Sequence, residues 1–585
     1  MAAVVDEKTQ PAPVAVAQEK DGGVVETAPT KESDDAASEQ FQGGVQRVRA
    51  ITASWSPATM WIMFVLLFIV SFVDMVVVAL QSSLDVYITS QFGAHGLLAS
   101  TGIASSVVSA CATLSLAKII DIWGRIEGFI FMLLLVVISL IMKATATTIE
   151  VYFGAFTLYW VGHIGLMYVV DIMLADMTTL KNRALIYGIN NLPTIASSFI
   201  GPALGNAFYN NTDFRWAYGS FAIILPVICL PVIVIMLWQQ RKATKSGALT
   251  RPKSGRTLMQ NIVYFLIEFD ALGLILVTAA FALFLLPFSI VSRAPNGWST
   301  PYIIAMIVTG LVIFPIFYLW EAKYAPVQFM PWRYLKDPTI LGSCSLYGIM
   351  FLSTFCWNSM FYSYVQVVYR LDIDTASYTV NAYSLSYAVL APVVGVLISV
   401  TGNFKTVAYG GIPLMVIGTA LLIPFRTPDT AVGLVVMTQV LIGMGSAFFV
   451  ACLQLAIFAP VTHQEFAVVS AINGMFGGIG ASIGMAIGGG IWNNLMPGQL
   501  EARLPENMKD QAFTIFGDIV LQMSFLDGTP EREAVVGAYG YVQRRMVIAG
   551  VCFMPLCLLS IYMWRNINVK KLEEEEGKQT KGTVW

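Results

Sequence analysis

The chain has 585 residues, of which 56% are hydrophobic and only 12% are charged. Soluble domains usually carry about 25% charged residues, so this composition excludes a water-soluble enzyme of this length. A formal net charge of -2 gives no basic surplus for nucleic acid, and the expected class is an all-α polytopic membrane protein.

The first stretch, residues 1–59, is too polar to bury a core and lacks the apolar segment of a signal peptide. We expect a disordered cytoplasmic tail there. Beyond it, apolar runs long enough to cross a bilayer recur as far as residue 564. They predict fourteen spans, at 60–80, 97–117, 128–147, 151–175, 184–209, 215–237, 269–289, 300–320, 339–365, 375–400, 406–425, 430–458, 464–492 and 546–564.

The spans form two groups of six with two inserted between them. We expect an N-terminal six-helix bundle at 60–237 and a C-terminal six-helix bundle at 339–564. The remaining segments are a linker at 238–268, two inserted helices at 269–320, a loop at 321–338 and a tail at 565–585.

Lys and Arg are more frequent in the predicted loops on the side of the linker 238–268 than in those on the other side. By the positive-inside rule, that side and both termini are cytoplasmic. The sequon Asn210-Asn211-Thr212 then falls outside, where Asn210 is a possible glycosylation site.

The two groups of spans share an internal repeat. Ile189-Asn190 and Gly201 in the fifth span match Ile472-Asn473 and Gly484 in the thirteenth. Parallel repeats of this kind predict a carrier whose halves rock around a site near the middle of the membrane.

A short turn between spans 2 and 3 carries Asp121, Gly124 and Arg125. Its charges suit a cytoplasmic gate that pairs with helix ends when closed and releases them when open. An ordinary basic loop is the alternative.

Ionisable residues inside spans are rare because each costs about 2.5–3.5 kcal/mol at a helix centre. Asp74 lies deep in span 1, on one polar side with Gln81 and Asp85, and span 4 carries His163 and Asp171. Asp74 and Asp171 are candidate proton carriers that would be buried and would change access as the halves rock. A structural hydrogen bond is the alternative, and for His163 it is the favoured one.

Small residues line two spans. Gly201 and Gly205 mark span 5, and Gly480, Gly484 and Gly488 mark span 13. Such glycines let helices pack closely. Asn190 and its repeat partner Asn473 are better candidates for a substrate cavity, because amides are costly to bury unpaired.

An aromatic face suits a bulky, partly apolar ligand. Trp357, Asn358 and Phe361 lie on one side of span 9, and Tyr383 and Tyr387 follow in span 10. Lipid-facing aromatics are the alternative.

The sequence favours neither a bare metal cargo nor a nucleotide as energy source. It has 3 histidines, no intramembrane Cys/His ligand spacing and no GxxxxGK[ST] loop. We expect no cofactor, and the remaining energy source is an ion gradient. Residues 495–545 are predicted as an external segment that lies over the mouth as a lid or rests on the headgroups.

Four motifs together resemble the major facilitator superfamily, and within it the fourteen-span fungal siderophore-iron transporters of the Mir type, which carry ferric triacetylfusarinine C. The resemblance covers residues 60–565. The motifs are Asp121-x-x-Gly124-Arg125-x-Glu127, Asp171 to Asp176-Met-Thr178 running on to Arg183, Phe214-Arg215-Trp216-Ala217-Tyr218, and Asp270-Ala-Leu-Gly273.

The resemblance implies a monomer in the plasma membrane that imports a ferric hydroxamate by proton symport, with Asp176 and Arg183 joining the gate. Iron would arrive already wrapped by the siderophore, which agrees with the absence of metal-ligand spacing. Gly201-Pro202-Ala203-Leu204-Gly205 also resembles the span 5 motif of drug exporters, and Pro202 with these glycines would pack helices. Proton-driven export of drugs or toxins therefore remains the alternative function.

Overall fold

The computed structural model describes residues 55–177, 186, 189–190, 192–245, 257–327, 330, 332–461 and 465–568. Within these residues the named elements are all helices, which confirms the predicted all-α class. The predicted tails and Arg183 fall largely or wholly outside the described residues. All seven cysteines are free, and six of them are buried.

The N-terminal half contains six long helices whose apolar side chains pack into one core. These helices are α2 (Pro57–Gln91), α3 (Leu98–Trp123), α4 (Arg125–Ala144), α5 (Ile149–Met177), α7 (Pro193–Asn211) and α8 (Phe214–Lys245).

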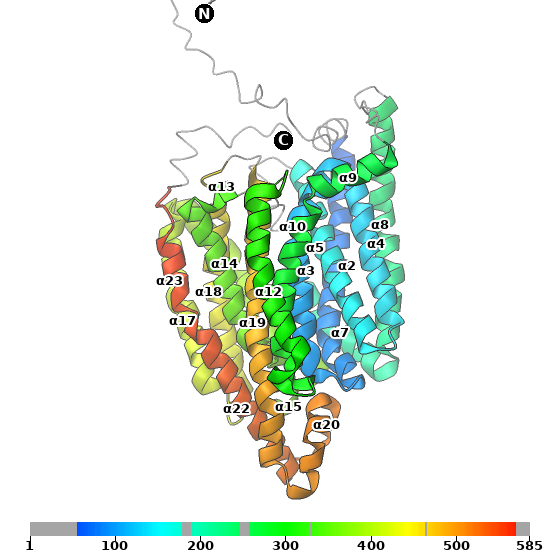
Figure 1. Cartoon of the computed structure of the whole chain (residues 1–585). Helices are drawn as coiled ribbons and strands as arrows, with labels where there is room; N and C mark the ends of the chain where they lie inside the picture. Colours follow the sequence, from blue (N-terminus) through cyan, green and yellow to red (C-terminus); the bar gives the residue numbers. More distant parts are fainter. Residues whose placement is uncertain are drawn as a thin grey trace, which may run out of the picture. The chain divides into compact units, whose positions relative to one another are not determined.

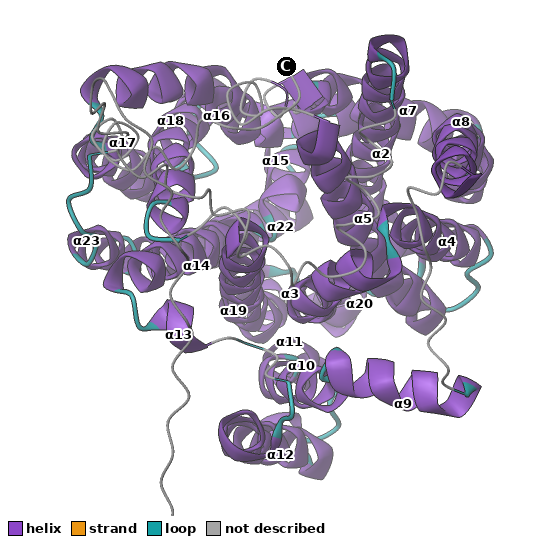
Figure 2. Ribbon diagram, turned by 90° about the horizontal axis from the view of Figure 1, so that it is seen from above, coloured by secondary structure: helices purple, strands orange, loops and turns teal. Residues whose placement is uncertain are grey.

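Four helices follow between the halves. They are α9 (Leu258–Glu268), α10 (Ala271–Leu285), α11 (Pro287–Ile290) and α12 (Pro301–Leu319). Seen from above, α10 and α12 lie beside the region where α3 and α19 of the two halves pack against each other (Figure 2).

The C-terminal half holds the remaining helices. They are α13 (Trp332–Leu335), α14 (Pro338–Asn358), α15 (Phe361–Tyr369), α16 (Ile373–Thr401), α17 (Phe404–Phe425), α18 (Val432–Phe458), α19 (Phe466–Arg503), α20 (Ala512–Gly517), α21 (Ile519–Ser524), α22 (Pro530–Cys552) and α23 (Pro555–Tyr562).

The bundle has two ends, which we name by their landmarks. The linker end carries α9 and α13, and the loop end carries α20 (Figure 1). Helix α21 packs against α20. Helices α2, α14 and α22 each begin with a capping side chain followed by proline: Ser56-Pro57, Asp337-Pro338 and Thr529-Pro530. A cap oxygen and a proline at the first helical position fix where a helix starts.

Thirteen helices of the described residues are long and apolar enough to cross a membrane, one fewer than the fourteen predicted spans. The span absent from the thirteen is the predicted fifth, at 184–209, where the structure describes α7. Serine, glycine, proline and asparagine dilute its apolar residues. Helix α7 packs against α2 of the N-terminal half and α16 of the C-terminal half, so helices of both halves cover part of its less apolar surface.

Two predicted segments have different boundaries in the structure. The predicted continuous helix 339–365 breaks between α14 and α15, and the freed carbonyl of Trp357 accepts hydrogen bonds from Arg426 Nη1 (2.9 Å) and Gln543 Nε2 (2.8 Å). Within the predicted external segment 495–545, α19 continues to Arg503 and α22 already begins at Pro530, and the external position of the segment stays a prediction.

The glycines of the two small-residue spans lie at close helix contacts. A Cβ atom added at Gly480, Gly484 or Gly488 would collide with the carbonyl oxygens of Gly348, Leu352 and Cys356 in α14. A Cβ atom at Gly201 or Gly205 would instead collide with the side chains of Ala79 and Ser83 in α2, and Pro202, between these glycines in the sequence, is buried. Small residues allow this approach of backbones.

Candidate functional site

A buried contact between an aspartate and a histidine lies at the centre of the N-terminal half. Asp74 is the middle residue of the 35-residue helix α2 and has 0% exposure. Its Oδ2 lies 2.6 Å from His163 Nδ1 of α5. The other oxygen, Oδ1, has no hydrogen-bond partner among the described residues. Two groups that each bind and release a proton therefore share one buried contact.

Aromatic rings enclose the histidine of this pair. Tyr159 stacks on His163 with ring centroids 5.9 Å apart, and Trp160 meets the same ring edge-on at 5.3 Å. One helical turn from Asp74, Ser71 Oγ donates to Asn190 Oδ1 at 3.1 Å. Asn190, a predicted cavity residue, therefore lies beside the polar side of α2.

A second polar cluster fills the same half closer to the loop end. Tyr152 of α5 donates to Asp85 Oδ1 at 2.5 Å and contacts Tyr218 of α8 at 3.0 Å. Lys143 of α4 donates to Gln81 and lies over the rings of Tyr152, Phe156, Tyr159 and Tyr218.

Lys143 is a residue that the sequence analysis missed. It is completely buried, with 0% exposure. The signal was present, because a lysine inside the predicted span 128–147 is as costly as the aspartates that we singled out.

Asp171 lies eight residues beyond His163 on α5, toward the linker end. We expected it to be buried, but it is exposed. The two predicted proton carriers thus lie in different surroundings. Asp74 is enclosed by side chains, whereas the surface of Asp171 is exposed in the structure.

The predicted gate lies at the linker end. Arg125 Nε pairs with Asp176 Oδ2 at 3.1 Å, and the guanidinium is 6% exposed. Gly124 joins α3 to α4 with φ of 118°, in the region that favours glycine. Asp121 lies in the last turn of α3, and its side chain is outside the described residues, as is Arg183.

The predicted substrate-binding residues separate into two sets. Tyr383, Tyr387 and Asn358 are half-buried, and Asn473 is buried with an unpartnered Oδ1. Tyr383 OH contacts Ser446 Oγ at 3.0 Å.

The rings of Trp357 and Phe361 are instead part of the core, with 1% and 0% exposure. Arg426 lies over both rings, with its Cζ 4.8 Å and 3.8 Å from the two ring centroids. These two aromatics therefore do not line an accessible face in this structure, because the helix break before Phe361 turns them inward against Arg426.

The segment between α19 and α22 bridges the two halves at the loop end. On the N-terminal side, the amide of Ile519 donates to Ser90 Oγ at 3.2 Å. On the C-terminal side, Tyr539 OH donates to Gln522 Oε1 at 2.6 Å. A direct contact between the halves, from Gln366 Nε2 to Tyr87 OH at 2.6 Å, lies next to this segment.

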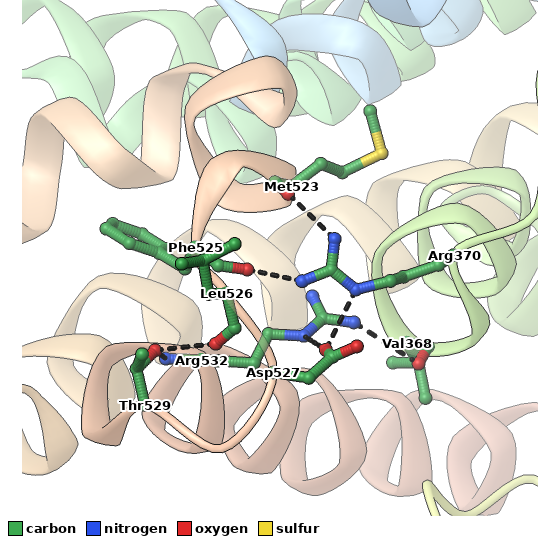
Figure 3. A network of polar contacts seen from close by, with 8 residues as sticks. All are labelled: Val368, Arg370, Met523, Phe525, Leu526, Asp527, Thr529 and Arg532. Atoms are coloured by element: carbon green, nitrogen blue, oxygen red, sulfur yellow. Dashed lines mark hydrogen bonds and ion pairs between the residues drawn. The ribbon is translucent and has the colours of Figure 1, made fainter.

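Figure 3 shows how the C-terminal half holds this segment. Arg370 Nε pairs with Asp527 Oδ1 at 2.8 Å, its Nη1 donates to Met523 O at 3.1 Å, and its Nη2 donates to Phe525 O. Arg532 approaches the same Asp527 oxygen at 3.3 Å. The hydrogen bond from Arg370 is the main cause that lowers the pKa of Asp527 below its ordinary value of 3.8. The carboxylate is thus charged across the neutral and mildly acidic range.

No group of three or more His, Cys, Asp or Glu side chains that could hold a metal ion occurs among the described residues.

A family model described as "Major Facilitator Superfamily" matches residues 60–485. A protein of Ajellomyces capsulatus named MFS siderochrome iron transporter 1 is 58% identical over 95% of this chain and 96% of its own length. Siderophore iron transporter mirB of Emericella nidulans is 38% identical over 94% of this chain and 91% of its own length.

Solved structures share the fold at low sequence identity. A bacterial homologue of the human lysosomal transporter Spinster has a TM-score of 0.53 and 12% identity, over 87% of this chain and 97% of that one. A mutant of the peptide transporter POT has a TM-score of 0.54 and 13% identity, over 86% of this chain and 95% of that one.

Proposed function

Because this chain belongs to the major facilitator superfamily, among the fungal siderochrome iron transporters, and is not an enzyme, we propose that it imports a ferric hydroxamate siderophore by proton symport. The proposed cellular location is the plasma membrane, with both termini and the linker end facing the cytoplasm. The observation that carries the proton coupling is the buried contact between Asp74 and His163.

The central pair suits proton coupling because a buried carboxylate and imidazole can exchange one proton without leaving a net charge in the bilayer. A proton taken up from outside would neutralise Asp74 or charge His163. Asp171, which is exposed and lies nearer the linker end, is the proposed group for discharge to the cytoplasm. Movement of one proton through 100 mV supplies about 2.3 kcal/mol, or roughly 45-fold accumulation.

The substrate would lie between the halves, against buried and half-buried polar side chains. Asn190 and Asn473 from the two repeats, with Tyr383 and Tyr387, are the proposed contacts. They offer amide and hydroxyl groups to the organic shell of a siderophore, whose iron remains wrapped. We leave Trp357 and Phe361 out of this surface because Arg426 covers both rings.

The two ends of the bundle suit alternating access. At the loop end, the segment held by Ser90, Tyr539 and Arg370 would have to separate from one half before the outer side opens. At the linker end, the Arg125–Asp176 pair would break when the inner side widens.

The decisive experiment is uptake of gallium-loaded triacetylfusarinine C by fungal cells that lack their own siderophore carriers. Cells that express this chain should accumulate the label more at acidic external pH, and a protonophore should abolish accumulation. Uptake no higher than in cells with empty vector would refute import. Net loss of label from preloaded cells would favour the export alternative suggested by Gly201 to Gly205.

A further inference from the structure

The two polar clusters of the N-terminal half form one ladder of contacts between α2 and α5. Asp85 pairs with Tyr152, and Asp74 pairs with His163. The partners are 11 residues apart on each helix (85 − 74 and 163 − 152), so both contacts belong to one antiparallel register. Eleven residues correspond to about three turns, which returns a side chain to the same face about 16 Å along the axis.

The interval between these two contacts is filled by polar and aromatic groups. Lys143 Nζ lies 5.6 Å from the centroid of Tyr152 and 4.6 Å from the centroid of Tyr159. Tyr159 in turn stacks on His163. Asp85, Tyr152, Lys143, Tyr159 and His163 therefore follow one another from the loop end to the centre of the half.

Two polar atoms of this ladder are left unpaired although they are buried. The hydroxyl of Tyr159 and Oδ1 of Asp74 have no hydrogen-bond partner among the described residues, and both residues have 0% exposure. Unpaired buried polar atoms cost free energy. Both atoms therefore keep the capacity to bond to a further polar group on a proton route.

The ladder begins next to a pocket at the loop end. This pocket of about 210 Å³ is lined by residues of α2, α7 and α8, among them Leu84, Ile88 and Phe214. Leu84 and Ile88 flank Asp85 on α2, and Phe214 lies one turn before Tyr218 on α8. Asp85 itself is 8% exposed, whereas Tyr152 and Tyr218 are 0% exposed. Asp85 is thus the most exposed residue of its cluster.

We propose that the ladder of Asp85, Tyr152, Tyr218, Lys143 and Tyr159 is the proton access route from the loop end to the Asp74–His163 pair. The inference rests on the proton-coupled import proposed above. Asp85 takes a proton from water and becomes the neutral acid. Each tyrosine hydroxyl or water on the route accepts one proton and gives up another, so Asp85 returns to the carboxylate and the proton arrives at the Asp74–His163 pair.

Lys143 acts in this route as a positioning residue. Its ammonium group compensates the Asp85 carboxylate when that group is charged, and it holds Gln81 on the face of α2 between the two aspartates. The groups that face Asp85 are Tyr152 from α5, Tyr218 from α8 and Lys143 from α4.

The test uses the full chain in proteoliposomes with gallium-loaded triacetylfusarinine C, in two modes. Uptake driven by an acidic exterior requires proton delivery, whereas exchange of label at equal pH on both sides requires only binding and movement of the loaded carrier. We expect Asp85→Asn to lower the initial driven rate at least tenfold and to abolish its rise on acidification. Tyr152→Phe, which removes one hydroxyl, should lower it three- to tenfold.

The rate of label exchange in Asp85→Asn and Tyr152→Phe should stay within twofold of the wild-type rate. That result would also show that both variants fold. The matched control is Tyr364→Phe, because Tyr364 is a buried tyrosine of α15 outside the ladder. Its rates of driven uptake and of exchange should both stay within twofold of the wild-type rates. Asp74→Asn should lose driven accumulation and keep exchange.

Each outcome decides between the two proposals. Wild-type driven rates in Asp85→Asn and Tyr152→Phe, with an inactive Asp74→Asn, would overturn the access route and leave the central coupling site intact. Equal losses of driven uptake and exchange in both ladder variants would also overturn the route, in favour of a structural role. Accumulation by Asp74→Asn would refute the coupling site itself.

Discussion

Replacing one or both members of the Asp74–His163 pair should show that the stability of the fold and the coupling of transport to protons depend on the pair in different ways. The contact joins a 0% exposed carboxylate to an imidazole whose side chain is 10% exposed. Removing one member of a buried pair costs about 3–5 kcal/mol because the other is left without a partner, whereas replacing both with apolar residues is often neutral. Asp74→Leu should therefore be much less stable than Asp74→Leu combined with His163→Leu.

Thermal unfolding in detergent measures the stability difference. A loss of 3–5 kcal/mol corresponds to a decrease in Tm of roughly 2–4 °C for a chain of this length, and the double variant should recover most of it. Uptake driven by a proton gradient should nevertheless be absent from both variants. The reasoning would be refuted if the double variant accumulated substrate, or if Asp74→Leu melted at the wild-type temperature.

Three further predictions concern packing and the loop end. Gly484→Ala should lower Tm, because its Cβ would collide with Leu352 O and overpacking costs about 1–3 kcal/mol, whereas Gly474→Ala in the same helix has open space and should keep or raise Tm. Ser90→Ala leaves the Ile519 amide without its acceptor, at a cost of about 1–3 kcal/mol, so hydrogen exchange of that amide should accelerate roughly 5- to 100-fold. Ser82→Ala, an exposed serine of the same helix, should not change it. Because the pKa of Asp527 is lowered, its contact with Arg370 is present above the ordinary aspartate range and is lost only as pH falls through the lowered value. Hydrogen exchange of residues 519–527, corrected for intrinsic rates, should thus be equal at pH 7 and pH 5, and faster exchange at pH 5 would contradict this.

The sequence was sufficient to find the members of the central pair but not their contact. Asp74 and His163 stand out because each is an ionisable residue in an apolar run. Periodicity gives the face of each helix on which they lie, but it does not say which helices face each other. The packing of α2 on α5 settles that, and it also brings Lys143 from α4 and Tyr218 from α8 into the same cluster.

Helix interruptions are the other limit of sequence reasoning here. Spacing along one continuous helix put Trp357 and Phe361 on a common open face. The break between α14 and α15, held by Arg426 and Gln543, removes that continuity, and no proline or glycine lies between these residues to indicate it. Likewise, polar residues in 495–545 predicted an external segment, but they did not indicate how far the flanking helices α19 and α22 continue into it.

The two halves share a scaffold but not their buried charges. Asp74, Asp85, Lys143 and His163 all lie in the N-terminal half, whereas α14, the first long helix of the C-terminal half, contains no Asp, Glu, Lys, Arg or His. The buried Arg426 of the C-terminal half is held by the Trp357 carbonyl and two aromatic rings, so it supports a helix break instead of facing a carboxylate. The repeat is kept where helices must pack, at Gly201 and Gly484. If protons are exchanged on one side only, then the proton-bearing half is the one whose charge changes during the cycle, and the other half provides the surface against which it moves.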